Sequence, residues 1–110
     1  MASSAASAAT LIEHMTRRVV RRFRPERVIL FGSHARGEAG PDSDIDLLVV
    51  LPIEGSKREK RIQIRLALHG LHAAADVIVS TPEEFAWRKD IVGTVEYPAA
   101  HEGKVLYERR

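Results

Sequence analysis

The stretch from Phe31 to Val50, FGSHARGEAGPDSDIDLLVV, decides the fold of this 110-residue chain. It begins with a glycine-serine turn after a short apolar run and ends in a second apolar run, which opens with Asp44 and Asp46. Side chains two residues apart on a strand point to the same face of the sheet, so these two carboxylates lie together. Like charges at this spacing repel each other. A divalent, oxygen-binding cation such as Mg2+ would relieve the repulsion.

The composition limits the class of protein. A chain of 110 residues with 45% apolar and 29% charged residues is a single folded domain. No apolar run approaches the roughly 20 residues that cross a bilayer, and the absence of cysteine excludes disulfides, thiolate zinc sites and a cysteine nucleophile. Residues 1–9, MASSAASAA, lack the basic start and long apolar core of a secretory signal. We therefore expect a disordered start over residues 1–9, one domain over 10–110 and a cytoplasmic location.

Helical and strand patterns alternate along the chain. We expect helices over residues 8–23, 57–72 and from 81 onward, one helical turn at 33–37, and strands over 27–31, 44–51, 75–80 and 104–107. Residues 95–103 are ambiguous, although Pro98 can open a last short helix. The run DIDLLVVL is apolar beyond its aspartates, as expected for a central strand covered on both faces. This order predicts an α/β (α+β) fold in which a small mixed β-sheet is flanked by helices.

Residue types and their spacing predict where the helices begin and which of their side chains are buried. Thr10, with a glutamate three residues later, is a candidate capping box for the first helix. Apolar spacing predicts that four residues of the 57–72 helix face inward: Ile62, Leu66, Leu68 and Leu71. It predicts the same for three residues of the following helix: Phe85, Ile91 and Val92.

The small residues before the aspartates suit an anion. Gly32 allows close approach of the backbone, and Ser33 adds a hydroxyl donor. Phosphate donors beside metal-binding carboxylates indicate a nucleoside-triphosphate site, and two-metal phosphoryl chemistry calls for a third carboxylate. Asp76 opens an apolar strand as Asp44 does, so a sheet that aligns the two strand starts would bring it to the pair. Two other acidic residues compete for this role: Asp42 and Glu54.

One combined pattern joins these residues to a known family. The segments GSHARG (32–37) and SDIDL (43–47) resemble the signature of the nucleotidyltransferase superfamily, which has the polymerase-β-like fold. The Ala-Arg-Gly after the serine and the serine before the aspartates are similar to the minimal nucleotidyltransferases (MNT). These are often the antitoxin half of a HEPN/MNT toxin–antitoxin pair. The resemblance covers nearly the whole chain, including the EGKVLY ending.

The resemblance implies a role for each matching residue. Gly32 and Ser33 would bind the triphosphate of ATP. Two Mg2+ ions would be held by three carboxylates, of which the last would also help to activate an acceptor hydroxyl: Asp44, Asp46 and Asp76. Arg36 would either contact the triphosphate or buttress the acidic loop through Glu38 or Asp42. The reaction would transfer AMP to the hydroxyl and release pyrophosphate.

The resemblance also implies a partner. In the family the acceptor is commonly the cognate HEPN toxin, a helical RNase that the modification silences, so we expect a protein acceptor and no direct nucleic-acid substrate. Two alternatives remain open, namely an antitoxin that acts by contact alone and an aminoglycoside-type enzyme that modifies a small molecule. A homo-oligomer, or a hetero-oligomer with the toxin, is compatible with so short a chain. Four basic residues of the first helix form either a solvated face or a patch for phosphate or an acidic partner: Arg17, Arg18, Arg21 and Arg22.

Overall fold

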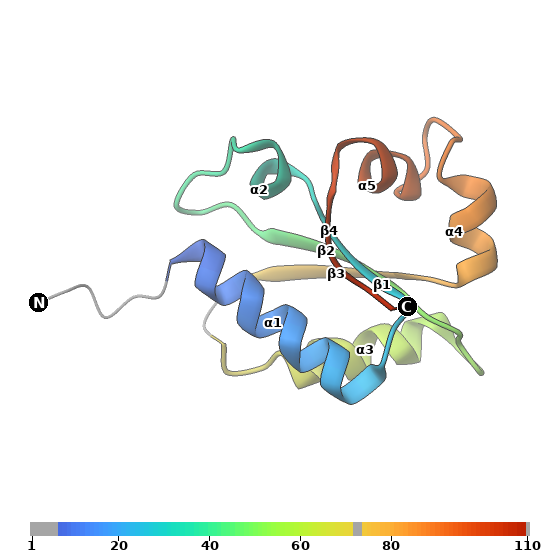
Figure 1. The fold of residues 1–110 in the computed structure, drawn as a ribbon. Coiled ribbons are helices and arrows are strands. Elements are labelled where there is room, and N and C mark those ends of the chain that lie inside the picture. Colours follow the sequence, from blue (N-terminus) through green and yellow to red (C-terminus); the bar gives the residue numbers. More distant parts are fainter. Residues whose placement is uncertain (1–6, 72–73, 110) are drawn as a thin grey trace, which may run out of the picture.

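The computed structural model describes residues 7–71 and 74–109 (Figure 1). In chain order the elements are α1 (Ala8–Phe23), β1 (Arg27–Phe31), α2 (Ser33–Arg36), β2 (Ile45–Val50), α3 (Lys57–Ala67), β3 (Ala75–Ser80), α4 (Pro82–Arg88), α5 (Glu96–Glu102) and β4 (Lys104–Glu108). The predicted α/β fold is confirmed. None of the helices in the described part of the chain has the length and apolar character needed to span a membrane.

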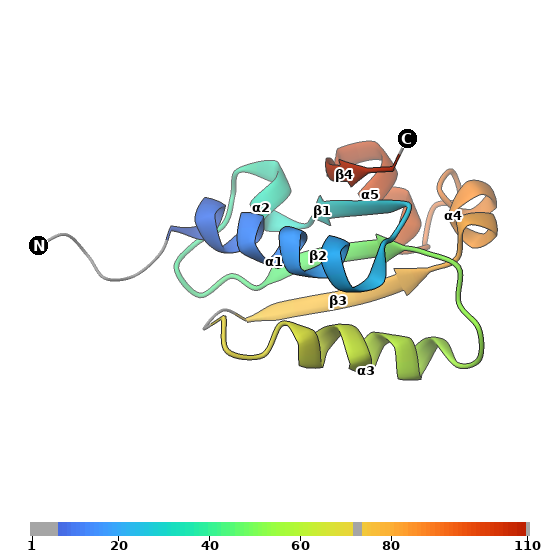
Figure 2. The same ribbon diagram turned by 60° about the horizontal axis from the view of Figure 1, so that its bottom comes forward.

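The four strands form one mixed sheet in the order β3-β2-β1-β4. β1 is antiparallel to both β2 and β4, whereas β2 and β3 run parallel and are joined by the α3 crossover (Figure 2). β2 is an inner strand whose side chains are buried except for Asp46, which is half-buried. Its near-continuous apolar run therefore reflects cover on both faces.

Two apolar layers hold the helices to the sheet. On one face, side chains of α1 and α3 pack against alternate residues of β2 and β3, among them Met15, Val19, Leu47, Val49, Ile64 and Val77. On the other face, the intervening residues of β2 meet α4 and α5 through Leu48, Val50, Phe85 and Ala99. Asp46 is two residues before Leu48, so it belongs to the face that carries α4 and α5.

α1 spans Ala8–Phe23, the range that the apolar spacing predicted, but its cap differs from the predicted one. The Ser7 hydroxyl caps the helix by accepting a hydrogen bond from the Thr10 N–H at 3.2 Å, so the cap is Ser7 and not Thr10. Ala8 and Ala9 thus lie in the first turn, inside the range predicted to be disordered. Residues 1–6 lie outside the described residues, and disorder there stays a prediction.

Two predictions of inward-facing side chains are wrong. Ile62 and Leu66 are exposed, because Ile64 of α3 and Leu68 at its C-cap face the sheet instead. The inward position predicted for Leu68 is confirmed, and Leu71 packs against the core as predicted. The α3 helix also ends at Ala67, earlier than the predicted residue 72, which is outside the described residues.

Ile91 and Val92 are exposed as well, because α4 ends at Arg88 and both residues lie in the connection to α5. The ambiguous segment 95–103 forms α5, which starts at Glu96, two residues before Pro98.

Candidate functional site

The register of the sheet brings two of the predicted carboxylates together. β2 and β3 are parallel, with Asp46 paired directly with Asp76. Paired residues on neighbouring strands project to the same face, about 5 Å apart across the hydrogen-bonding direction. Sequence reasoning expected Asp76 to meet the aspartate pair at aligned strand starts, and the parallel crossover produces that alignment.

Gly32 lies against the Asp46 carboxylate. β1 and β2 are antiparallel with Phe31 opposite Asp46, so the residue after Phe31 turns over the Asp46 side chain. A Cβ atom built on Gly32 would lie 2.2 Å from Asp46 Oδ2 and 3.1 Å from its Cγ. Gly32 also has φ 76° and ψ −156°, a conformation restricted essentially to glycine. The glycine is therefore required both by the backbone and by the close approach of the carboxylate.

The electrostatics of Asp46 reflect its position. Burial raises the pKa of Asp46, and the neighbouring carboxylates of Asp76 and then Asp44 raise it further. His34 and Arg36 oppose this shift more weakly. The nearby positive groups therefore do not offset the burial of Asp46 and the charges of its two carboxylate neighbours, which is the condition that a bound cation relieves.

Asp44 lies just before β2 and is exposed. It occupies the same side of the chain as Asp46, and its charge acts on Asp46 less than that of Asp76 does. Asp44 also lines an open hollow at the β3 edge together with Arg65 and His69 of the α3 end. It is therefore the most solvent-accessible of the three predicted carboxylates.

Arg61 is a neighbour of the site that the sequence did not reveal. It belongs to α3, on the opposite face of the sheet, and its Nη2 lies 3.4 Å from Asp76 Oδ1. β3 is the edge strand, so the long side chain reaches Asp76 around that edge. The two side chains are 41% and 49% exposed, which makes the pair weak in stability terms but able to hold the Asp76 carboxylate. Nothing in the sequence distinguished Arg61 from the other basic residues of α3.

The α2 turn places the remaining predicted residues. Ser33 is its first residue, and the Ser33 carbonyl accepts from the Glu38 N–H at 2.9 Å. Arg36 Nε donates to Glu38 Oε1 at 2.9 Å, and Arg36 Nη1 lies 3.9 Å from Glu102 Oε1. Of the two roles predicted for Arg36, this geometry matches the one in which Arg36 supports the acidic loop through Glu38. A triphosphate contact by Ser33 or Arg36 stays a prediction.

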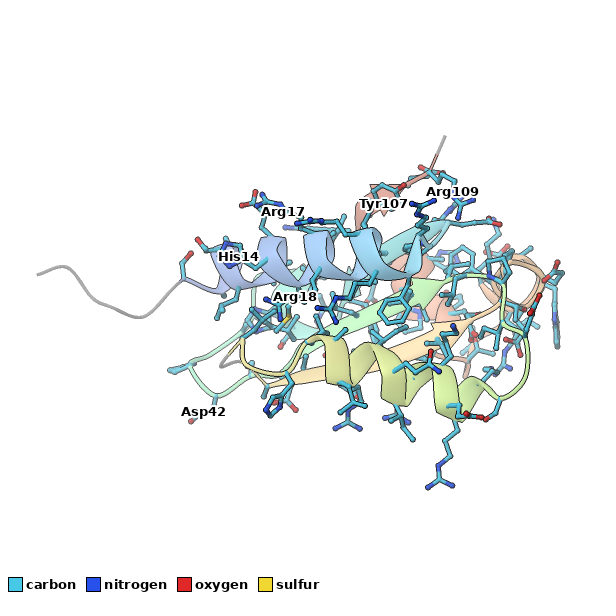
Figure 3. All side chains as sticks on the ribbon, turned by 90° about the horizontal axis from the view of Figure 1, so that it is seen from below. His14, Arg17, Arg18, Asp42, Tyr107 and Arg109 are labelled. Atoms are coloured by element: carbon cyan, nitrogen blue, oxygen red, sulfur yellow. The ribbon has the colours of Figure 1, made fainter. Side chains whose placement is uncertain are left out.

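The loop before β2 is held by neighbours of the aspartates. His34 Nε2 donates to the Ser43 carbonyl at 3.2 Å, and Ser43 Oγ accepts from the Gly40 N–H at 2.9 Å. Asp42 is exposed in this loop, near its tip in Figure 3.

One alternative third ligand lies at the other end of β2. Glu54 follows the far end of that strand, which from Asp46 to Val50 already spans roughly 13 Å. The register therefore pairs Asp76, and not Glu54, with Asp46, while the choice of Asp76 as third ligand stays a prediction.

The predicted ligands are chemically suited to bind Mg2+. All three predicted ligands are carboxylates, the type that hard divalent cations prefer. The described residues contain no ready group of three or more Asp, Glu or His side chains around one metal position. Because one Asp76 oxygen faces Arg61, the three carboxylates need side-chain rotation to share a cation. The observation that supports the fit is the pairing of Asp46 with Asp76, whose like charges raise the cost of keeping both carboxylates ionised.

Sequence comparison with known proteins gives two matches. A family model for the nucleotidyltransferase domain matches residues 12–100. A Methanocaldococcus jannaschii protein named as a candidate protein adenylyltransferase, MJ0141, is 43% identical over 42 residues, which is 38% of this chain. The matched segment spans 42% of that protein's length.

Solved structures share the fold. A candidate minimal nucleotidyltransferase aligns with a TM-score of 0.62 and 28% identity over 93% of this chain and 98% of that one. A toxin–antitoxin complex with AMP-PNP contains a chain that aligns with a TM-score of 0.62 and 18% identity over 89% of this chain and 74% of that one, a likeness of fold alone. The family match covers most of the chain, including Asp44, Asp46 and Asp76, and the protein therefore belongs to the nucleotidyltransferase family.

Proposed function

We propose that this protein is a Mg2+-dependent protein adenylyltransferase, which transfers AMP from ATP to a hydroxyl group of a partner protein. The observation that carries this proposal is the pairing of Asp46 with Asp76 beneath the turn at Gly32. Paired carboxylates next to a small-residue turn suit a nucleotide whose phosphates and metal ions arrive together. The likeness to a named protein adenylyltransferase supports the choice of acceptor.

The residues of the chain have distinct roles in this reaction. Gly32 and Ser33 bind the triphosphate, and Arg36 supports the turn through Glu38. The acceptor oxygen attacks the α-phosphorus of ATP, the bond from that phosphorus to the bridging oxygen of the β-phosphate breaks, and pyrophosphate leaves. Asp76 accepts the hydroxyl proton through the carboxylate oxygen that does not face Arg61.

Asp44, Asp46 and Asp76 would hold two Mg2+ ions, which when bound supply Lewis-acid stabilisation of the phosphate charge. The chain's own contribution is to keep the carboxylates in register. Asp46 is fixed between the glycine turn and β3, so the approach of the nucleotide needs little rearrangement of the backbone.

The partner that we propose is a HEPN toxin, which makes this chain the antitoxin of a toxin–antitoxin pair. The support is the family resemblance together with a fold neighbour that was solved in a toxin–antitoxin complex with AMP-PNP. The chain's own site offers carboxylates and a phosphate turn, and the hollow that Asp44 lines is open to solvent. A protein acceptor would supply a wall on that open side.

A transfer assay tests this function. The protein is incubated with Mg2+, ATP labelled at the α-phosphate and the purified protein encoded next to its gene, and label on the partner is followed by mass spectrometry of the modified residue. We expect one AMP adduct on a hydroxyl residue, and we expect Asp46→Asn or Asp76→Asn to abolish it while the fold is retained.

The same assay separates the alternatives. Inhibition of the partner that survives in the Asp44→Asn plus Asp46→Asn variant, without any label transfer, would indicate an antitoxin that acts by contact. Transfer to an aminoglycoside in place of the partner would indicate a small-molecule enzyme. Either result would overturn the proposed reaction.

A further inference from the structure

An apolar groove runs between α1 and the edge strand β4. Its volume is about 560 Å3. Its apolar floor is formed by Ala9, Ile12, Val20, Leu106 and Tyr107, and the polar Thr16 lies beside them. α1 therefore presents two faces, since Met15 and Val19 are buried in the core while Ile12, Thr16 and Val20 line this groove. Ile12 and Val20 are half-buried against the edge of the core, and the rest of their surface is open to the groove.

An irregularity in β4 creates the other wall of the groove. Val28 pairs with Tyr107 and Ile29 with Val105, so Leu106 is an extra residue opposite the shift in register. A bulge of this kind turns neighbouring side chains towards the same side, and Leu106 and Tyr107 both line the groove. β4 is also the edge of the sheet. Edge strands beside an apolar surface are the positions that folded proteins normally cover.

The rim of the groove is strongly basic. Arg17 and Arg21 line it directly, and a second hollow continues from it past Arg24 and Arg109. Figure 3 shows Arg17, Tyr107 and Arg109 along the same side of α1, whereas Arg18 points towards α3 and donates to the Ala67 carbonyl at 3.1 Å. Among the residues that line the groove, Glu13 is the one acid, and it pairs with Arg17 at 3.6 Å.

We infer that this groove docks an acidic, amphipathic segment of another protein. The apolar floor calls for apolar side chains, and the four arginines on the rim call for Asp or Glu on either side of them. A second copy of this chain is disfavoured, because a two-fold contact would bring the arginine rims of both copies together. Nucleic acid is disfavoured as well, since phosphate backbone offers nothing to the apolar floor, and only a half-buried tyrosine could stack on a base.

The groove lies away from the candidate active site. α1 packs on the face of the sheet that carries Leu47 and Val49, whereas Asp46 is on the opposite face with α4 and α5. A partner segment held in the groove would leave the carboxylates accessible. The inference therefore does not depend on the proposed reaction, and its test measures binding without nucleotide.

The first experiment defines the ligand without assuming a partner. A display library of random 16-residue segments is selected against the full chain in physiological salt, and enriched segments are synthesised for measurement of Kd. We expect the enriched segments to combine several acidic residues with apolar residues on one side. Enrichment of basic or uncharged segments, or no enrichment above background, would overturn the inference.

Variants then locate the binding site. Arg17→Glu with Arg21→Glu should weaken the Kd of the best segment by roughly tenfold or more, because it places like charges across the contact. Thr16→Trp, which fills the groove without changing charge, should weaken it similarly, provided that the melting temperature shows an intact fold. The matched control, Arg22→Glu with Arg58→Glu, makes the same charge change at exposed positions outside the groove and should alter Kd by less than about twofold.

The other occupants give different results. If the control weakens binding as much as the groove variant, the contact is general electrostatic attraction and the groove is not the site. If a 20-nucleotide single-stranded RNA displaces the segment and Thr16→Trp leaves RNA binding unchanged, the surface binds nucleic acid. If sedimentation shows a dimer that Arg17→Glu with Arg21→Glu dissociates, the groove belongs to a self-contact. Each of these three results would overturn the inference.

Discussion

Replacing Gly32 by alanine would test the contact that organises the candidate site. The new Cβ would lie 2.2 Å from Asp46 Oδ2, so the carboxylate would have to rotate out of its position. The backbone at φ 76° and ψ −156° costs a non-glycine residue about 1–3 kcal/mol. Forcing the Asp46 side chain off its rotamer adds about 0.5–1.5 kcal/mol. We therefore expect the free energy of unfolding to fall by about 2–4 kcal/mol.

This loss converts to a clear change in melting temperature. The entropy of unfolding, about 2.1 cal/mol/K per residue, amounts to roughly 0.23 kcal/mol/K for 110 residues. Gly32→Ala should lower the melting temperature by roughly 9–17 °C in differential scanning calorimetry. Gly37→Ala is the matched control, because Gly37 has φ 73° but nothing within 4 Å of its added Cβ. Strain alone should cost the control about 1 kcal/mol, or roughly 4 °C.

A double-mutant cycle isolates the contact with the carboxylate. Asp46→Ala removes Oδ2 and Cγ but leaves its Cβ, which lies 3.4 Å from the added Gly32 Cβ, an ordinary contact distance. In that background Gly32→Ala should cost only the backbone strain, giving a coupling energy of about 0.5–1.5 kcal/mol. Equal melting temperatures for Gly32→Ala and Gly37→Ala, with no coupling to Asp46, would refute the reasoning.

Three further predictions follow from the charges. In EDTA, Asp46→Asn should raise the free energy of unfolding at pH 7 on the order of 1 kcal/mol, because burial, Asp76 and Asp44 raise the pKa of Asp46 and the folded state therefore disfavours its carboxylate. Urea denaturation should show this gain disappearing as the pH falls below the ordinary pKa of 3.8, where Asp46 is protonated in both the folded and the unfolded state. A loss of stability at pH 7 would contradict the prediction. Arg61→Gln should change the melting temperature by less than roughly 4 °C, since the ion pair with Asp76 is exposed. It should nevertheless tighten Mg2+ binding in calorimetric titration, because it removes a competing cation, and weaker binding would show that Arg61 supports the site. Glu96→Ala should lower the free energy of unfolding by about 3 kcal/mol in chemical denaturation. The reason is that this 3%-exposed carboxylate accepts a hydrogen bond from Ser80 Oγ at 3.0 Å and lies 3.3 Å from Arg88 Nε. An effect below about 1 kcal/mol would mean that the buried pair is replaceable.

Local patterns in the sequence predict the order of helices and strands, and they indicate which residues form the central motif. Alternation between β-branched runs and amphipathic segments predicted all four strands, and the apolar run after Asp46 predicted that β2 is an inner strand. The glycine, the serine and the two aspartates were found from local chemistry, because phosphate turns and paired carboxylates need neighbouring residues of defined type. Helix ends were predicted less well, since Ser7 and Thr10 are both competent caps and only the observed first turn distinguishes them.

Packing decided what local pattern left open. Around α3, the apolar pattern predicted the burial of Leu68 but also predicted Ile62 and Leu66 to face inward, and packing on the sheet left these two exposed and buried Ile64 in their place. The tertiary structure alone placed Asp76 in register with Asp46, brought Arg61 around the sheet edge to meet it, and set α1 beside β4 to form the basic groove. These contacts join residues distant in the chain, and their geometry depends on strand register and helix orientation, which no single segment of sequence encodes.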